Sequence, residues 1–225
     1  WLDIGSWGRI GITLLFGLRM IALGSLLVGR VKTHMLGTVF HLIGGVLIPG
    51  GVLVAISELN ISTTSSWTYT IAFGSIFVFH VLLMLAHRHD ILTFFAIGNG
   101  TAFLYLLVGS ILDKPFYRSE DIYVYLTMIV GASYLLLAHA FKKGWNERLV
   151  GPLNFLGSSW FLGACFYKVF DAPLWQMLYF FILIGGLYVA VQIKSRSVLA
   201  LSTLFLIAHL TYITSEYFAD SVGWP

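Results

Sequence analysis

Residues 173–193 read PLWQMLYFFILIGGLYVAVQI, an apolar run without a charged side chain. A helix needs about 20 such residues to cross the ~30 Å hydrocarbon layer of a bilayer. The run is bounded by Asp171 on one side and by Lys194 and Arg196 on the other. It predicts a transmembrane helix, and the rest of the chain divides into apolar segments of similar length.

Further segments of similar length and hydropathy precede and follow this run. The predicted spans are 8–29, 36–58, 67–87, 91–112, 122–141, 150–170, 173–193 and 197–219. The sixth is the weakest because polar residues and Lys168 interrupt it. Short connections favour antiparallel packing of successive helices. The sequence thus predicts an all-α integral membrane protein, a bundle of about eight transmembrane helices arranged as antiparallel hairpins.

The composition agrees with a bilayer environment. Of the 225 residues, 58% are hydrophobic and only 10% are charged, whereas a soluble domain carries roughly 25% charged residues. So few charges cannot cover a surface that faces water. No basic cluster is long enough for a nucleic-acid footprint. The expected partner is the lipid bilayer, with other membrane subunits as candidates and no nucleic acid.

Basic residues gather in alternate connections between the spans. With residue 1 outside, the inner connections hold Arg30, Lys32, Arg88, Lys142, Lys143, Arg148, Lys194 and Arg196. The outer side holds Lys114, Arg118, Lys168 and Arg9, together with most of the acidic residues. Since Lys and Arg concentrate in cytoplasmic loops, residue 1 is predicted on the non-cytoplasmic side.

The second span contains Pro49, Gly50 and Gly51. Proline removes a helical hydrogen bond and clashes with the preceding turn, so these residues are candidates for a kink. Broken helices often line transporter sites, although such kinks are common in any spanning helix. In the fourth span, Asn99 lies near mid-span and is expected to seek an interhelical partner.

Arg19 is the strongest ionisable candidate. It lies near the middle of the first span, too far from either end for easy snorkelling. A charge there is costly unless it is compensated. We expect it to face the bundle interior and to meet a carboxylate, carbonyl, water or lipid phosphate, either as structural pairing or as an anion or headgroup site.

Four intramembrane histidines lie in different spans: His41, His80, His139 and His209. Imidazole titrates near neutral pH and ligates metals or tetrapyrroles. His80 and His87 share a helical face, so any metal site would draw on His80, His87, His139 and His209. Separate interhelical hydrogen bonds are the favoured interpretation, and the absence of a cofactor is favoured over haem or chlorophyll.

The last span carries a polar stripe. His209, Tyr212 and Glu216 share a face with Ser202 and Phe205. The stripe is either a path for protons or cations or the packing seam of this helix, and the seam is favoured.

The C-terminal region, residues 195–225, resembles the closing region of a family of uncharacterised bacterial multi-pass membrane proteins. The matching residues are Ser195, Arg196, Tyr217, Phe218, Ala219, Asp220, Ser221, Gly223, Trp224 and Pro225. The resemblance implies a bacterial inner-membrane location and further helices, but no activity. We expect residues 1–225 to form a single transmembrane domain. Because the chain begins at Trp1 and ends on an interfacial Trp-Pro, we also expect the protein to continue beyond both ends.

No motif demands chemistry, so an enzyme is not the favoured class. We expect a non-enzymatic accessory, scaffold or sensor subunit, or a binder of lipid or a small hydrophobic ligand. One alternative is a transporter or flippase that uses the second span and Arg19. Another is a haem-, chlorophyll- or metal-binding subunit that uses the intramembrane histidines.

Overall fold

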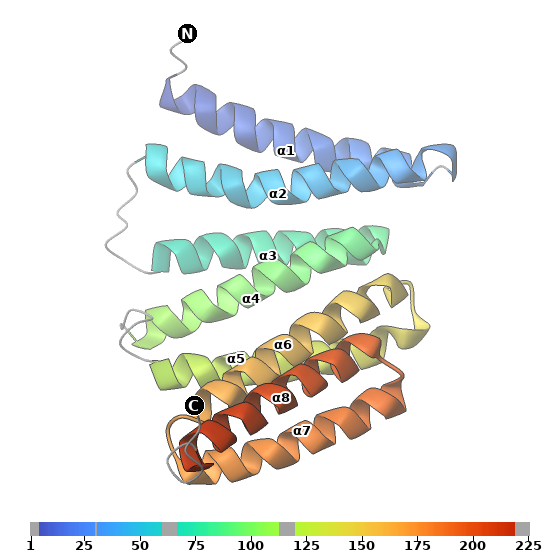
Figure 1. Ribbon diagram of the computed structural model, residues 1–225. Helices are drawn as coiled ribbons and strands as arrows, with labels where there is room; N and C mark the ends of the chain where they lie inside the picture. Colours follow the sequence, from blue (N-terminus) through green and yellow to red (C-terminus); the bar gives the residue numbers. More distant parts are fainter. Residues whose placement is uncertain (1–4, 30, 60–66, 113–119, 219–225) are drawn as a thin grey trace. The chain divides into compact units, whose positions relative to one another are not determined.

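The computed structural model describes residues 5–29, 31–59, 67–112 and 120–218, and they fold almost entirely as helices (Figure 1). The long helices are α1 (Ser6–Val28), α2 (His34–Glu58), α3 (Trp67–His87), α4 (Asp90–Leu112), α5 (Glu120–Ala140), α6 (Val150–Lys168), α7 (Pro173–Ile193) and α8 (Arg196–Phe218). Each of the eight is long and apolar enough to cross a membrane. The predicted spans match them to within about two residues.

The helices pack as sequential hairpins: α1 with α2, α3 with α4, α5 with α6, and α7 with α8. This confirms the predicted fold class. Their outward faces are apolar, and many large aliphatic and aromatic side chains lie exposed on them, as expected for helices surrounded by hydrocarbon.

The chain groups into two compact units, Trp1–Arg118 and Ser119–Pro225. The first unit holds α1 to α4 and the second holds α5 to α8. Each unit is described by itself below. That residues 1–225 act as one domain stays a prediction.

In the first unit, glycine brings the backbones of α1 and α2 together. A methyl group at Gly44 would lie 2.8 Å from the carbonyl oxygen of Gly17, and one at Gly37 would lie 2.9 Å from that of Gly24. Small residues permit such close approach between spanning helices. The spacing of these glycines along α1 and α2 therefore sets the register of this hairpin.

Glycine and phenylalanine interlock in the hairpin of α3 and α4. The ring of Phe103 lies over Gly74, the ring of Phe77 lies over Gly100, and the two rings stack with centroids 6.3 Å apart. A buried hydrogen bond of 2.7 Å joins Thr70, near the start of α3, to Ser110, near the end of α4. The Gly-Phe pairs and the hydroxyl pair fix this hairpin at two levels.

The α2 helix is continuous from His34 to Glu58, through Pro49. The helix is thus unbroken at Pro49, and both a bend at Pro49 and a transporter role for this helix stay predictions. Gly51 makes room for Leu14 of α1, while Gly50 faces open space. Of the two glycines beside the proline, only Gly51 serves a close contact.

The second unit has a similar backbone contact and a larger apolar core. A methyl group at Gly131 of α5 would lie 2.5 Å from the Phe161 amide nitrogen of α6. The core around α6, α7 and α8 is built on Leu162, Cys165, Val169, Tyr179 and Leu183. The sixth helix, the weakest of the predicted spans, is thus central to this unit.

Candidate functional site

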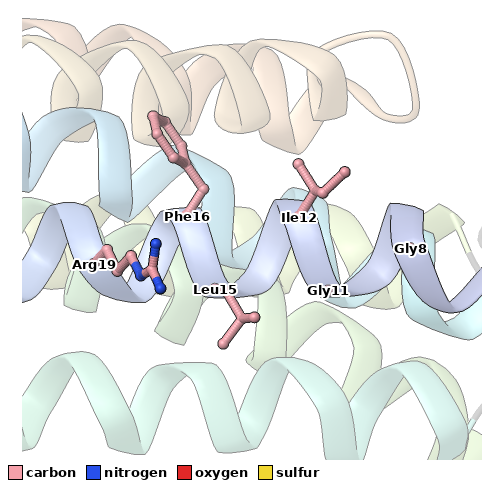
Figure 2. A pocket seen from close by; sticks show the side chains of 6 residues that line it. All are labelled: Gly8, Gly11, Ile12, Leu15, Phe16 and Arg19. Atoms are coloured by element: carbon pink, nitrogen blue, oxygen red, sulfur yellow. The ribbon is translucent and has the colours of Figure 1, made fainter. Parts of the chain in front are cut away.

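Arg19 lies on an exposed face of α1, and this differs from the predicted position inside the bundle (Figure 2). The helix turns its glycines Gly17 and Gly24 toward α2, and Arg19 lies off that contact face. The side chain extends along α1 toward Leu15 (Figure 2), as expected because helical side chains lean toward the N-terminus.

An open groove of about 410 Å³ runs along this face of α1 (Figure 2). Its lining is Gly8, Gly11, Ile12, Leu15, Phe16 and Arg19. The two glycines lie at one end of the groove, the exposed apolar side chains lie between, and the guanidinium closes the other end. We call this surface the α1 face.

The depth of Arg19 makes the α1 face unusual. At 1.5 Å per residue, Arg19 lies about 20 Å from the start of α1 and about 14 Å from its end. In the described part of the chain, every Asp and Glu lies at or just beyond a helix end. No described carboxylate pairs with Arg19, whereas Arg9, nearer the end of α1, pairs with Glu58 at 2.7 Å.

A group of four histidines lies where α1, α2, α3 and the turn before α4 meet. The ring centroid of His41 lies 5.3 Å from that of His89 and 6.2 Å from that of His87. The ring of His34 lies 5.6 Å from that of His89. The candidate histidines of the sequence include His41 and His87 but not His34 and His89, whose approach to the other two depends on the packing of α2 against the start of α4.

His89 acts as the cap of α4. The Ile91 amide donates to its Nδ1 at 3.3 Å, so Nδ1 is unprotonated and Nε2 donates to Thr38 Oγ1 at 3.2 Å. The Thr38 hydroxyl in turn donates to the carbonyl of His34 at 3.0 Å. This neutral tautomer satisfies the first turn of α4 and links it to α2.

His41 is fully buried, and its Nε2 lies 3.2 Å from Ser25 Oγ of α1. Its Nδ1 has no hydrogen-bond partner, and the Ile21 carbonyl lies near the ring without reaching hydrogen-bonding geometry. The bond to Ser25 agrees with the interhelical interpretation of this residue. The contacts of this group are therefore those of helix capping and packing, while the buried Nδ1 of His41 lacks a hydrogen-bond partner.

The other candidates of the first unit stay close to their own helices. His80 is buried and its Nδ1 pairs with the Ile76 carbonyl at 2.9 Å, while its Nε2 lacks a partner. Asn99 donates to the Phe95 carbonyl of its own helix at 2.8 Å, not to a neighbouring helix as expected. His87 is exposed at the end of α3, so it does not share the buried position of His80.

In the second unit, the α8 stripe goes from buried to exposed. His209 is fully buried, packs edge to face on Tyr179 with centroids 5.1 Å apart, and neither ring nitrogen has a hydrogen-bond partner. The Gln176 carbonyl lies near this ring. Tyr212 packs on Phe170 at 4.9 Å, and Glu216 is exposed.

These contacts favour a packing seam for the stripe over a connected path, since no hydrogen bond joins His209, Tyr212 and Glu216 in the described chain.

His139 is exposed in the last turn of α5, whereas His209 is buried in α8. Among the described residues, no three His, Cys, Asp or Glu side chains are grouped so that they could hold a metal ion.

Sequence reasoning missed a buried ion cluster at Lys168. This side chain is only 5% exposed and contacts Asp121 of α5 and Asp171 just beyond α6, the latter at 2.7 Å. Its Nζ also lies 5.4 Å from the ring centroid of Tyr125. A lysine at the end of a predicted span reads as interfacial, so the sequence held little signal of its burial.

No family model, curated protein or solved structure matches this chain. The resemblance of residues 195–225 to a bacterial membrane protein family is therefore without support from these comparisons, and its residues from Ala219 to Pro225 lie outside the described part. What stands is that the chain is an integral, multi-pass membrane protein with eight candidate spans.

Proposed function

We propose that this chain is a non-enzymatic membrane subunit that assembles with a partner membrane protein through the α1 face. The observation that carries the proposal is the exposed Arg19 at mid-span with no carboxylate of the described chain at its depth. An arginine at the centre of a helix costs about 2.5–3.5 kcal/mol on insertion scales. A partner that neutralises it recovers much of this cost.

The partner is proposed to be a transmembrane helix with an acidic side chain near mid-span. Its carboxylate would bond bidentately to the guanidinium, which favours planar anions. Gly8 and Gly11 would let the partner backbone approach the outer end of α1. A second copy of the described chain does not meet this requirement, because its acids also lie at helix ends.

A lipid headgroup is the competing occupant of the α1 face. The guanidinium lies over the preceding turn, near Leu15, and not toward the closer end of α1 (Figure 2). A phosphate would have to descend well below the headgroup level to meet it, or the bilayer would have to thin locally. We therefore favour a protein carboxylate, and the lipid becomes one outcome of the test.

The test uses a synthetic leucine-rich transmembrane helix with one glutamate at mid-span. Fluorescence energy transfer in vesicles of neutral lipid measures its association with the labelled protein. We expect association that falls at least tenfold when the probe carries leucine at that position, or when the protein carries Arg19→Leu. Arg19→Lys should retain part of the association, because the charge remains while the bidentate fork is lost.

Two outcomes would refute this proposal. One is equal association of the glutamate probe with wild type and Arg19→Leu. The other is complete loss of association in vesicles of anionic lipid with no loss in neutral lipid, since lipid headgroups would then occupy Arg19. Gly50→Leu on α2, where Gly50 also faces open space, is the control for Gly11→Leu, which should block the approach of the probe.

The proposal includes the bacterial cytoplasmic membrane, with residue 1 on the non-cytoplasmic side. The support is the concentration of Lys and Arg in alternate connections. After Cys165→Ser, single cysteines at Lys143 and Glu120 should react with an impermeant reagent from opposite sides. Reaction of both from the same side would exclude this orientation.

A further inference from the structure

A second groove lies in the other unit, along the hairpin of α7 and α8. Its volume is about 380 Å³, and its lining is Pro173, Gln176, Met177, Phe180, Phe181, Ile213 and Tyr217. Met177, Phe181 and Tyr217 are more than half exposed. The groove is thus an open channel in the membrane-facing surface of this hairpin, and it does not involve the α1 face.

The polar groups of this groove are confined to one end. The Tyr217 hydroxyl of α8 donates to Gln176 Oε1 of α7 at 2.7 Å. This bond occupies the amide oxygen of Gln176, and its Nε2 keeps two hydrogens that donate to no described residue. The hairpin therefore holds an amide donor at the polar end of an otherwise apolar channel.

The depth of these groups matches the polarity profile of one bilayer leaflet. Along the helix axis, Gln176 lies about 5 Å and Phe181 about 12 Å beyond Pro173, where α7 begins. The donor thus lies near the headgroup boundary, and Met177, Phe180 and Phe181 follow at increasing depth. An acyl chain of the leaflet on that side runs in the same direction, from its ester linkage toward the bilayer centre.

We propose that this groove binds an ester-linked diacyl lipid of that leaflet. One acyl chain lies along Met177, Phe181 and Ile213, and the ester carbonyl accepts a hydrogen bond from Gln176 Nε2. Tyr217 orients the amide, and Pro173 at the first turn of α7 fixes the start of the channel. The headgroup stays in the interfacial layer and is not selected by the groove.

Native mass spectrometry of the detergent-solubilised full chain, titrated with a palmitoyl-oleoyl phosphatidylglycerol and with its ether-linked analogue, tests this site. We expect one ester lipid to be retained at collision energies that strip the others, and the ether lipid to be retained less. Gln176→Leu should weaken retention about fivefold, since one neutral hydrogen bond contributes little more. Ile213→Trp should abolish retention by filling the channel.

The chain offers matched controls for both variants. Gln192 also lies on α7 and donates to the Tyr188 hydroxyl of its own helix at 3.1 Å, away from the groove, so Gln192→Leu should change nothing. Leu210 is exposed on α8 but does not line the groove, so Leu210→Trp should likewise be neutral.

Tyr217→Phe separates recognition from stability, because it removes the interhelical bond and keeps the amide. The proposal expects a smaller loss of lipid for Tyr217→Phe than for Gln176→Leu. Equal losses would overturn it, because they would mean that the bond matters only for holding α7 to α8. Equal retention of the ester and ether lipids, or loss in both control variants, would overturn it as well.

Discussion

Gly24 of α1 lies directly against the imidazole of His41 on α2: a methyl group at Gly24 would come within 2.5 Å of Cδ2 and 2.9 Å of Nε2. The absence of a side chain on α1 therefore makes the space that a buried histidine occupies. It also brings Nε2 within hydrogen-bonding reach of Ser25, the next residue of α1. A glycine and a polar side chain thus form one unit of helix packing.

Gly24→Ala should displace the His41 ring and weaken the bond to Ser25. Because overpacking costs about 1–3 kcal/mol, we expect a lower melting temperature in mild detergent, measured by the loss of the monodisperse peak on heating. Combining Gly24→Ala with His41→Ala should cost less than the sum of the two, since the smaller side chain relieves the clash. Strict additivity would contradict this contact.

Two glycines of α2 provide a matched comparison. A methyl group at Gly44 would lie 2.6 Å from Ile21 Cγ1 and 2.8 Å from the Gly17 carbonyl, whereas nothing lies within 4 Å of one at Gly50. Gly44→Ala should destabilise the protein by about 1–3 kcal/mol. Gly50→Ala should be neutral or gain up to about 1 kcal/mol from helix propensity. A larger loss for Gly50→Ala in the same melting assay would contradict the α1–α2 register.

His89 should behave as a helix cap and not as a ligand. His89→Ala removes the acceptor for the Ile91 amide and the donor to Thr38, and losing a cap costs about 0.5–2 kcal/mol. His89→Asn should restore most of the loss, since asparagine is among the best capping residues. Hydrogen exchange of the amides of Ile91 to Thr93 measures this, and fast exchange in both variants would argue against capping.

The sequence predicted the helices far better than the surroundings of single side chains. Each span is determined locally, because about 20 consecutive apolar residues suffice to specify it. The position of Arg19 depends instead on which face of α1 packs against α2, and the glycines Gly17 and Gly24 decide that face. Those glycines were visible in the sequence, and their spacing was the signal that placed Arg19 on another face.

His89 and Lys168 were missed for a related reason. Both lie at helix ends, where a sequence cannot distinguish an interfacial side chain from one enclosed by a neighbouring turn. The second ring nitrogen of His89 bonds to Thr38 of another hairpin, and Lys168 pairs with Asp121 of α5. Contacts between residues about 50 positions apart are set by tertiary packing, which periodicity does not encode.

The stability of the protein should fall more when Lys168 loses both of its carboxylate partners than when it loses either one. Asp121→Asn or Asp171→Asn leaves one carboxylate on the ammonium, so each should have a small effect. The double variant leaves a buried charge without a counter-ion and should cost about 1–3 kcal/mol. This cost is smaller than for a fully buried ion pair, because Asp121 is 73% exposed and Asp171 is 47% exposed.

A double-mutant cycle read by thermal melting measures this coupling. Lys168→Met is the control, because it removes the charge and keeps the length of the apolar stem. It should cost less than the double variant, since the two exposed carboxylates remain solvated. A double variant as stable as the wild type would show that the cluster contributes nothing to the hairpin of α5 and α6.

Arg19→Leu should separate the stability of the chain from its assembly. No described side chain pairs with Arg19, so the substitution should leave the melting temperature of the isolated protein unchanged. Insertion of α1 should improve, because leucine replaces a residue that costs about 2.5–3.5 kcal/mol at the helix centre. Translocon-dependent glycosylation of a reporter carrying residues 1–35 measures insertion. Loss of stability in the isolated protein would instead place Arg19 in an internal contact, and the α1 face would then have no need of an acidic partner.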